Sequence, residues 1–177
     1  MNETADELAG VVDLFGGLTH AELEHALSEV AFRADGQTVD TDASETAIES
    51  ALETFALVRY TPENGAADDL EAGSDEPLLV VGPTAFPQTP EHAEDLPHIL
   101  DVSPRRPDRE AVGEAAQARF RKAVDASLED VTDGDGDIDE ATDTLEHLLD
   151  VSYDLEAWAP LDLSDERTRL TQALEDA

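Results

Sequence analysis

The chain has no cysteine, which excludes disulfides, thiolate metal sites and thiol nucleophiles. Lysine is almost absent too, because Lys122 is the only one and the other nine cations are arginines. No apolar run approaches the roughly 20 residues of a membrane-spanning helix. The acidic opening MNETADELAG lacks the basic start and apolar centre of a signal peptide. We therefore expect a cytoplasmic protein that does not associate with membranes.

Carboxylate is what the chain has in excess. Its 44 Asp and Glu against 10 Lys and Arg give a formal net charge of −34 over 177 residues. Such a charge destabilises a compact chain at low salt, but the Debye length falls to roughly 3 Å in molar salt and the repulsion is screened. An acidic disordered chain is the alternative, and an apolar content of 40% with helical periodicity argues against it. We expect a halophilic folded protein with K⁺ or Na⁺ on its surface, for which nucleic acid is an unfavourable partner.

Apolar periodicity predicts three helices in the first 60 residues. Thr4 with Glu7 and Thr19 with Glu22 are capping-box patterns at the start of the first two helices, and glycines at 16, 17 and 36 end them. A third helix is expected from about residue 42 or 44 to residue 55. Residues 56–60 and 77–81 then read as two strands of an antiparallel hairpin around an acidic loop. The first 82 residues thus form a three-helix and hairpin unit.

The remainder of the chain predicts more helix. Residues 83–106 are spaced by prolines, and we expect an ordered loop anchored by Phe86, Leu96, Ile99 and Leu100. Helices follow over about 107–128 and 141–151, the stretch YDLEAWAPLDL is expected to be an aromatic loop, and Ser164 can cap a last helix. The predicted fold is mainly α with a small antiparallel β-hairpin, in which a helical extension over 107–177 packs on the first part as one compact unit.

The order helix, helix, helix, strand, loop, strand over residues 5–82 resembles a winged-helix domain, most closely in ETAIESALETFALVRY followed by LLVVG. The helix that would read DNA in this resemblance exposes Glu45, Glu49, Ser50, Glu53 and Thr54 and has no Lys or Arg. Helices that read bases combine phosphate contacts with Arg, Lys, Asn or Gln, so a protein-binding surface fits better. Taken whole, the chain is similar to a family of uncharacterised haloarchaeal proteins in LLVVGPTAFP, DLPHILDV and YDLEAWAPLDL. This similarity implies a haloarchaeal origin and a cytoplasmic location, and it leaves the function open.

The segment from Asp133 to Asp139 looks like part of a calcium loop, with Asp133, Asp135, Asp137 and Asp139 as weak candidate ligands. If Gly136 takes the sixth position of such a loop, the twelfth is Thr142, where a bidentate Glu is needed. An acidic surface loop is the simpler interpretation. His92 and His98 stand beside three acids but lack a compact zinc motif. We expect no metal site and no cofactor.

Six of the ten cations lie between Arg105 and Lys122, which makes this part of the chain locally basic. Two interpretations stay open: Arg119, Arg121 and Lys122 bind an anionic partner, or the arginines pair with carboxylates of other helices. Tyr153 and Trp158 likewise form either a partner-binding patch or a plug of the core.

The sequence contains no phosphate-binding glycine loop and no nucleophile elbow. We expect a non-enzymatic protein–protein interaction or regulatory module whose binding surface is formed by Glu49, Glu53, Arg59 and Tyr60. The alternative function is a winged-helix transcription regulator that contacts DNA through Arg119, Arg121 and Lys122.

Overall fold

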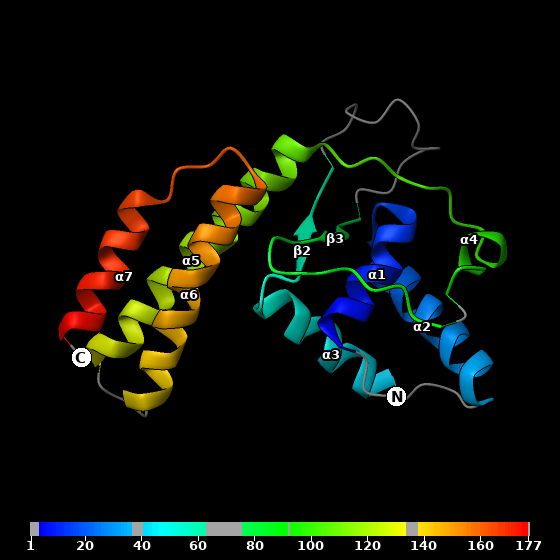
Figure 1. Cartoon of the computed structure of the whole chain (residues 1–177), viewed down its shortest axis with the longest axis horizontal. Coiled ribbons are helices and arrows are strands. Elements are labelled where there is room, and N and C mark those ends of the chain that lie inside the picture. The colour runs from blue at the N-terminus through cyan, green and yellow to red at the C-terminus, as the bar shows by residue number, and fades with distance from the viewer. Residues whose placement is uncertain (1–3, 37–40, 63–75, 92, 134–137, 177) are drawn as a thin grey trace. The chain divides into compact units, whose positions relative to one another are not determined.

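The computed structural model describes residues 4–36, 41–62, 76–91, 93–133 and 138–176. Over these ranges the chain is mainly helical and has one small three-stranded antiparallel sheet (Figure 1). This confirms the predicted fold class. The chain divides into two compact units, residues 1–112 and 113–177. The packing of the helical extension on the first part stays a prediction.

In the described residues of the first unit, four helices precede α5 (Arg109–Asp133). They are α1 (Ala5–Phe15), α2 (His20–Asp35), α3 (Thr41–Glu53) and the short α4 (Leu96–Ile99). Both predicted capping boxes form, because the Thr4 and Thr19 side chains accept from the backbone N–H of Glu7 and Glu22. Each glutamate in turn accepts from the backbone N–H of its threonine at 2.8 Å. The predicted starts of α1 and α2 are therefore confirmed.

The sheet consists of β1 (Leu18–Thr19), β2 (Leu57–Tyr60) and β3 (Leu78–Val81), in the order β1-β3-β2. The predicted hairpin is β2 with β3, in a register that pairs Leu57 with Val81 and Tyr60 with Leu78. β1 is a third strand that the sequence does not predict, because two residues are too few to show a period of two. β1 lies between α1 and α2 in the chain and pairs with β3.

The core of the first unit is built around α1, whose inward residues Leu8, Val11, Val12 and Phe15 have no exposed surface. Apolar side chains of α2, α3, β2 and β3 pack in the same buried cluster. Phe55 connects α3 to β2 with a φ of 61°, a left-handed conformation that is uncommon for an aromatic residue. The end of β3 packs on this turn, since a Cβ added to Gly82 would lie 2.1 Å from the Phe55 carbonyl oxygen.

The proline-spaced segment is held differently from the prediction. Leu96 and Leu100 are buried anchors as expected, but Phe86 and Ile99 are 78% and 39% exposed, so their prediction as anchors is wrong. The segment is held there by its backbone, because the Phe86 and Gln88 N–H groups donate to the Asp6 carboxylate and carbonyl, each at 2.9 Å. Because these bonds use the backbone, the segment is held on α1 while the Phe86 side chain stays exposed.

The second unit contains the greater part of α5 (Arg109–Asp133), together with α6 (Ile138–Trp158) and α7 (Ser164–Asp176). The predicted loop over residues 153–163 is wrong in its first half, since α6 continues to Trp158, whereas residues 159–163 do form a loop. The buried stripe of α6 runs through Leu145, Leu148, Ser152 and Leu155, and the polar Ser152 hides this stripe from a search for apolar periodicity. The Ser152 hydroxyl is satisfied inside the helix by the Leu149 carbonyl at 2.6 Å.

α7 begins at Ser164 as predicted, but the acceptor at its start is the Asp162 carboxylate, which receives the Ser164 N–H at 3.0 Å and the Ser164 hydroxyl at 2.7 Å. In the described part of the chain, no helix combines the length and the apolar content needed to cross a membrane.

Candidate functional site

The outer side of α3 is the surface that the sequence predicts for partner binding. The helix buries Ser44, Ile48, Ala51 and Leu52. Its exposed side carries Glu45, Glu49 and Glu53, four residues apart, so they form one row that rises roughly 6 Å per step. None of the exposed side chains of α3 is a cation.

Arg59 of β2 extends this row toward the sheet. Its Nη2 lies 3.2 Å from the Glu49 Oε1, and both side chains are about half exposed. We call Glu45, Glu49, Glu53 and Arg59 the α3 face. The structure thus brings together three of the four residues predicted for the partner surface.

Tyr60 is the exception, because it is only 5% exposed. Neighbouring residues of a strand point to opposite sides of the sheet, so Tyr60 and Arg59 lie on opposite faces of β2. The prediction that Tyr60 shares an exposed surface with Arg59 is therefore wrong.

The best-defined ion pair of the first unit joins Arg105 to α2. The Arg105 Nη1 and Nη2 donate to the two carboxylate oxygens of Glu22 at 2.6 and 2.8 Å, and Nη1 also donates to the Gly17 carbonyl at 3.0 Å. The two side chains are 14% and 25% exposed. The Arg105 backbone N–H donates to the Phe15 carbonyl at 2.6 Å, so both ends of this residue are fixed.

Glu22 therefore has two tasks, since it completes the capping box of α2 and neutralises Arg105. Burial disfavours its charged form, but hydrogen bonds from Arg105 and from the Thr19 backbone, together with the Arg105 charge, hold its pKa below the ordinary value. Of the two interpretations of the basic segment, Arg105 therefore follows the second, in which the arginine pairs with a carboxylate of another helix.

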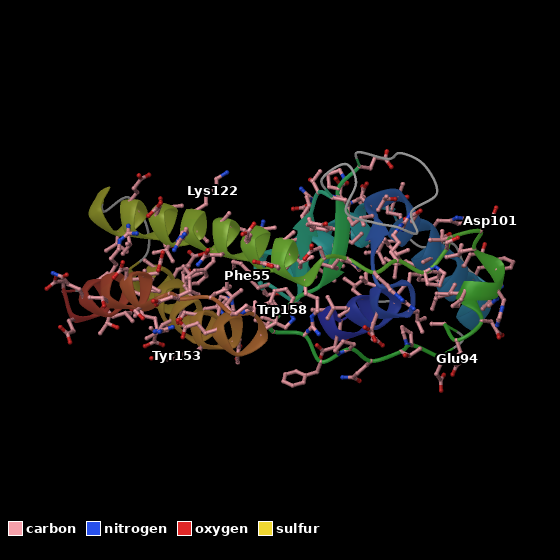
Figure 2. The ribbon with its side chains drawn as sticks, turned by 90° about the horizontal axis from the view of Figure 1, so that it is seen from above. Phe55, Glu94, Asp101, Lys122, Tyr153 and Trp158 are labelled. Atoms are coloured by element: carbon pink, nitrogen blue, oxygen red, sulfur yellow. The ribbon has the colours of Figure 1, made fainter. Side chains whose placement is uncertain are left out.

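In the second unit, α7 is joined to α5 by two ion pairs. The Arg121 Nε lies 2.5 Å from a carboxylate oxygen of Glu166, which is only 9% exposed, and Arg169 lies 2.8 Å from Asp125 on the exposed surface. The three residues of the nucleic-acid alternative are thus in different surroundings. Arg121 is paired with Glu166, Arg119 is half-buried, and Lys122 points away from α6 and α7 (Figure 2).

Arg167 joins α7 to α6. Its Nη1 and Nη2 lie 2.9 and 3.0 Å from the Glu156 carboxylate, and its guanidinium carbon lies 4.9 Å from the centre of the Tyr153 ring. Hydrogen bonds from Arg167 and from the Leu163 backbone lower the pKa of Glu156. Tyr153 is 58% exposed and Trp158 is half-buried, so neither is a fully buried plug of the core.

The weak metal candidates are largely outside the described residues. This applies to the Asp133 side chain, to Asp135 and Asp137, and to His92, whereas Asp139 is exposed in the first turn of α6 and His98 is exposed in α4. Within the described ranges, no three histidine or acidic side chains are grouped so that they could hold a metal ion.

Besides β1, two features of the first unit were not predicted from the sequence. The Glu22–Arg105 pair joins residues far apart in the chain, and a single sequence gives no indication of such a contact. The exposure of Phe86 has no indication in the sequence either, because proline spacing restricts the backbone without showing which side chains face the core.

Comparison with known proteins adds one assignment. No match to the chain was found among curated proteins or among solved structures. A family of unknown function, DUF7109, matches residues 6–175, and the chain therefore belongs to this family.

Proposed function

We propose that the chain is a non-enzymatic protein-binding or regulatory module of a halophilic cytoplasm, and that its first unit is a winged-helix-like domain whose α3 face contacts the partner. The element order α1, β1, α2, α3, β2, β3 and the sheet order β1-β3-β2 support the winged-helix part of the proposal. The observation that carries the protein-binding part is the α3 face itself. It has three exposed carboxylates, and the Arg59 guanidinium beside them is bound to Glu49.

A nucleic-acid partner is less well supported. Phosphates would meet three carboxylates of the α3 face against one cation, Arg59, which is already bound to Glu49, and molar salt removes most of the gain from counterion release. The alternative site on α5 fares no better, because the Arg121 guanidinium is engaged by Glu166. Lys122 remains the one residue of that set that is both exposed and directed away from the other helices of its unit.

The halophilic part of the proposal rests on charge that is spread over both units. Residues 1–112 contain 25 acids against 5 cations, and residues 113–177 contain 19 against 5, which gives net charges of −20 and −14. Each unit therefore depends on screening of its own surface, since neither has a cationic region large enough to compensate.

The test is purification of the tagged chain in molar KCl from the organism that encodes it, with mass spectrometry for proteins and staining for nucleic acid. The variant E45Q/E49Q/E53Q removes the charge of the α3 face while keeping side-chain size. A matched control, E129Q/E140Q/E146Q, removes the same charge from exposed positions of α5 and α6. We expect a stoichiometric protein partner that the control retains and the α3 variant loses. Recovery of DNA or RNA without a protein partner would contradict the proposal.

A further inference from the structure

The most exposed large apolar side chain in the described part of the chain is Phe86, at 78%, followed by Phe32 at 61%. Phe86 lies in the segment that leaves β3 and runs past α1 toward α4 (Figure 1). Single exposed apolar residues are common on protein surfaces and carry no meaning by themselves. What distinguishes Phe86 is the backbone that holds it.

Hydrogen bonds hold this segment at every second residue, through a side chain at Thr84 and through the backbone at Phe86 and Gln88. The Thr84 hydroxyl donates to the Thr54 carbonyl at 2.8 Å, the Phe86 N–H donates to the Asp6 Oδ1 at 2.9 Å, and the Gln88 N–H donates to the Asp6 carbonyl at 2.9 Å. The chain passes so close to α1 that a Cβ added to Gly10 would lie 2.0 Å from the Gln88 carbonyl oxygen.

Proline restrains the same segment from within, since Pro83 and Pro87 fix φ on either side of Phe86. The backbone of Phe86 is therefore ordered before any partner binds. Binding of the ring then has to restrict only its two side-chain torsions and not the backbone, which lowers the entropy cost of using it as an anchor.

Phe86 also lies close to the α3 face. Thr84 is bonded to Thr54, the residue that follows Glu53, and two residues of extended chain span about 7 Å at most. A partner that covers the C-terminal end of the α3 face would therefore reach Phe86 as well.

The surroundings of Phe86 are acidic. Its own N–H is bound to the Asp6 carboxylate, Glu91 is exposed further along the segment, and residues 60–104 contain no Lys or Arg. A complementary surface would be apolar where it receives the ring and cationic around it.

We propose that Phe86 is an anchor that inserts into an apolar pocket of a protein partner whose rim carries Lys or Arg. This inference rests on the proposed protein-binding function and extends its surface from the α3 face to the segment 84–88. The apolar contact of the ring contributes affinity that molar salt does not weaken, whereas the neighbouring carboxylates select a partner with a basic rim.

The experiment places a photoreactive benzophenone analogue of phenylalanine at position 86 of the full-length chain, and at position 32 in a control. Each protein is irradiated in a lysate of the encoding organism in molar KCl. We expect one protein adduct from position 86 that position 32 does not give, with the crosslink mapped to apolar residues flanked by Lys or Arg. Absence of such an adduct, or an adduct with a second copy of this chain, would overturn the inference.

The crosslinked protein is then purified and titrated with wild-type chain, Phe86→Ala and Phe32→Ala. Loss of a central aromatic anchor should weaken binding by roughly 30-fold, and loss of the exposed control ring by less than about 2-fold. Both rings are exposed, so the variants are expected to fold, and circular dichroism checks this. If Phe86→Ala binds like wild type while the α3 variant does not bind, the anchor is refuted and the proposed function stands. If all variants bind like wild type, both proposals fail.

Discussion

The Glu22–Arg105 pair allows a prediction with an internal control, because the chain contains two capping boxes of the same design. In α1, Glu7 accepts from the Thr4 N–H at 2.8 Å, as Glu22 does from the Thr19 N–H in α2. Glutamine can take the same place in a capping box, so the substitutions Glu7→Gln and Glu22→Gln each keep that bond. Only Glu22→Gln removes the charge that faces Arg105.

The geometry of the pair gives the expected loss of stability on Glu22→Gln. Arg105 makes two charge-assisted hydrogen bonds to Glu22, and these side chains are only 14% and 25% exposed, so salt screens the pair incompletely. Hydrogen bonds to charged groups contribute about 1.5–3 kcal/mol, and we expect Glu22→Gln to lower the free energy of unfolding of the first unit by about 2 kcal/mol. Glu7→Gln loses only an interaction with the helix dipole, about 0.5 kcal/mol.

The assay is urea unfolding in molar KCl, with hydrogen exchange of the α2 amides to report on the first unit. Arg105→Gln should cost much less in the Glu22→Gln background than in the wild type, because the partner is already lost. Equal losses from Glu7→Gln and Glu22→Gln would refute the reasoning. So would additivity of the two substitutions in the double variant.

The same pair predicts a pH dependence. The folded-state pKa of Glu22 is lowered, so its contribution is complete above the ordinary value of 4.5 and is lost as the pH falls through the lower folded value. The difference in stability between wild type and Glu22→Gln should therefore shrink on acidification below about pH 4.5. A difference that stays constant or grows there would contradict the assignment.

Three further predictions concern other parts of the chain. Arg121→Gln should lower the free energy of unfolding of the second unit by about 1–2 kcal/mol, because it leaves the buried Glu166 unpaired. The control Lys122→Gln should not change it. Unfolding followed by the fluorescence of Trp158 measures both variants, and equal effects would refute the structural role of Arg121. Gly10→Ala should destabilise the first unit by about 1–3 kcal/mol despite the better helix propensity of alanine, with faster hydrogen exchange over residues 84–90, because the added Cβ meets the Gln88 carbonyl. Dilution from molar to about 0.1 M KCl should lower the melting temperature of each unit by about 4–8 °C or more. Addition of sucrose should not restore the melting temperature, because sucrose does not screen charge. A melting temperature independent of salt would refute the electrostatic account.

Local chemistry made much of the first unit predictable. The capping boxes at Thr4 and Thr19, the glycines after α1 and α2, and the β2–β3 hairpin all depend on residues that are near one another in the sequence. β1 was missed because its two residues become a strand only by pairing with β3. The end of α6 was missed because the buried Ser152 interrupts an otherwise apolar stripe.

The candidate site was predictable only in part, for a related reason. The row of Glu45, Glu49 and Glu53 follows from helical spacing alone, and Arg59 follows from strand alternation. The burial of Tyr60 follows from the same alternation once Arg59 is placed on the outer face, whereas the exposure of Phe86 depends on contacts between distant segments. In particular, a proline-spaced stretch gives no indication of whether its backbone or its side chains hold it in place, and here the Asp6 hydrogen bonds decide.

The most direct test of the protein-binding account is the KCl dependence of the affinity between the chain and its co-purified partner. Contact with a protein through the apolar Phe86 ring predicts an affinity that holds or strengthens as KCl is raised within the molar range, where charges at the surface are already screened. Contact with nucleic-acid phosphates predicts that log affinity falls linearly with log salt, by about 0.9 for each phosphate neutralised on a duplex. A flat or rising curve would support the account, and a steep fall would contradict it.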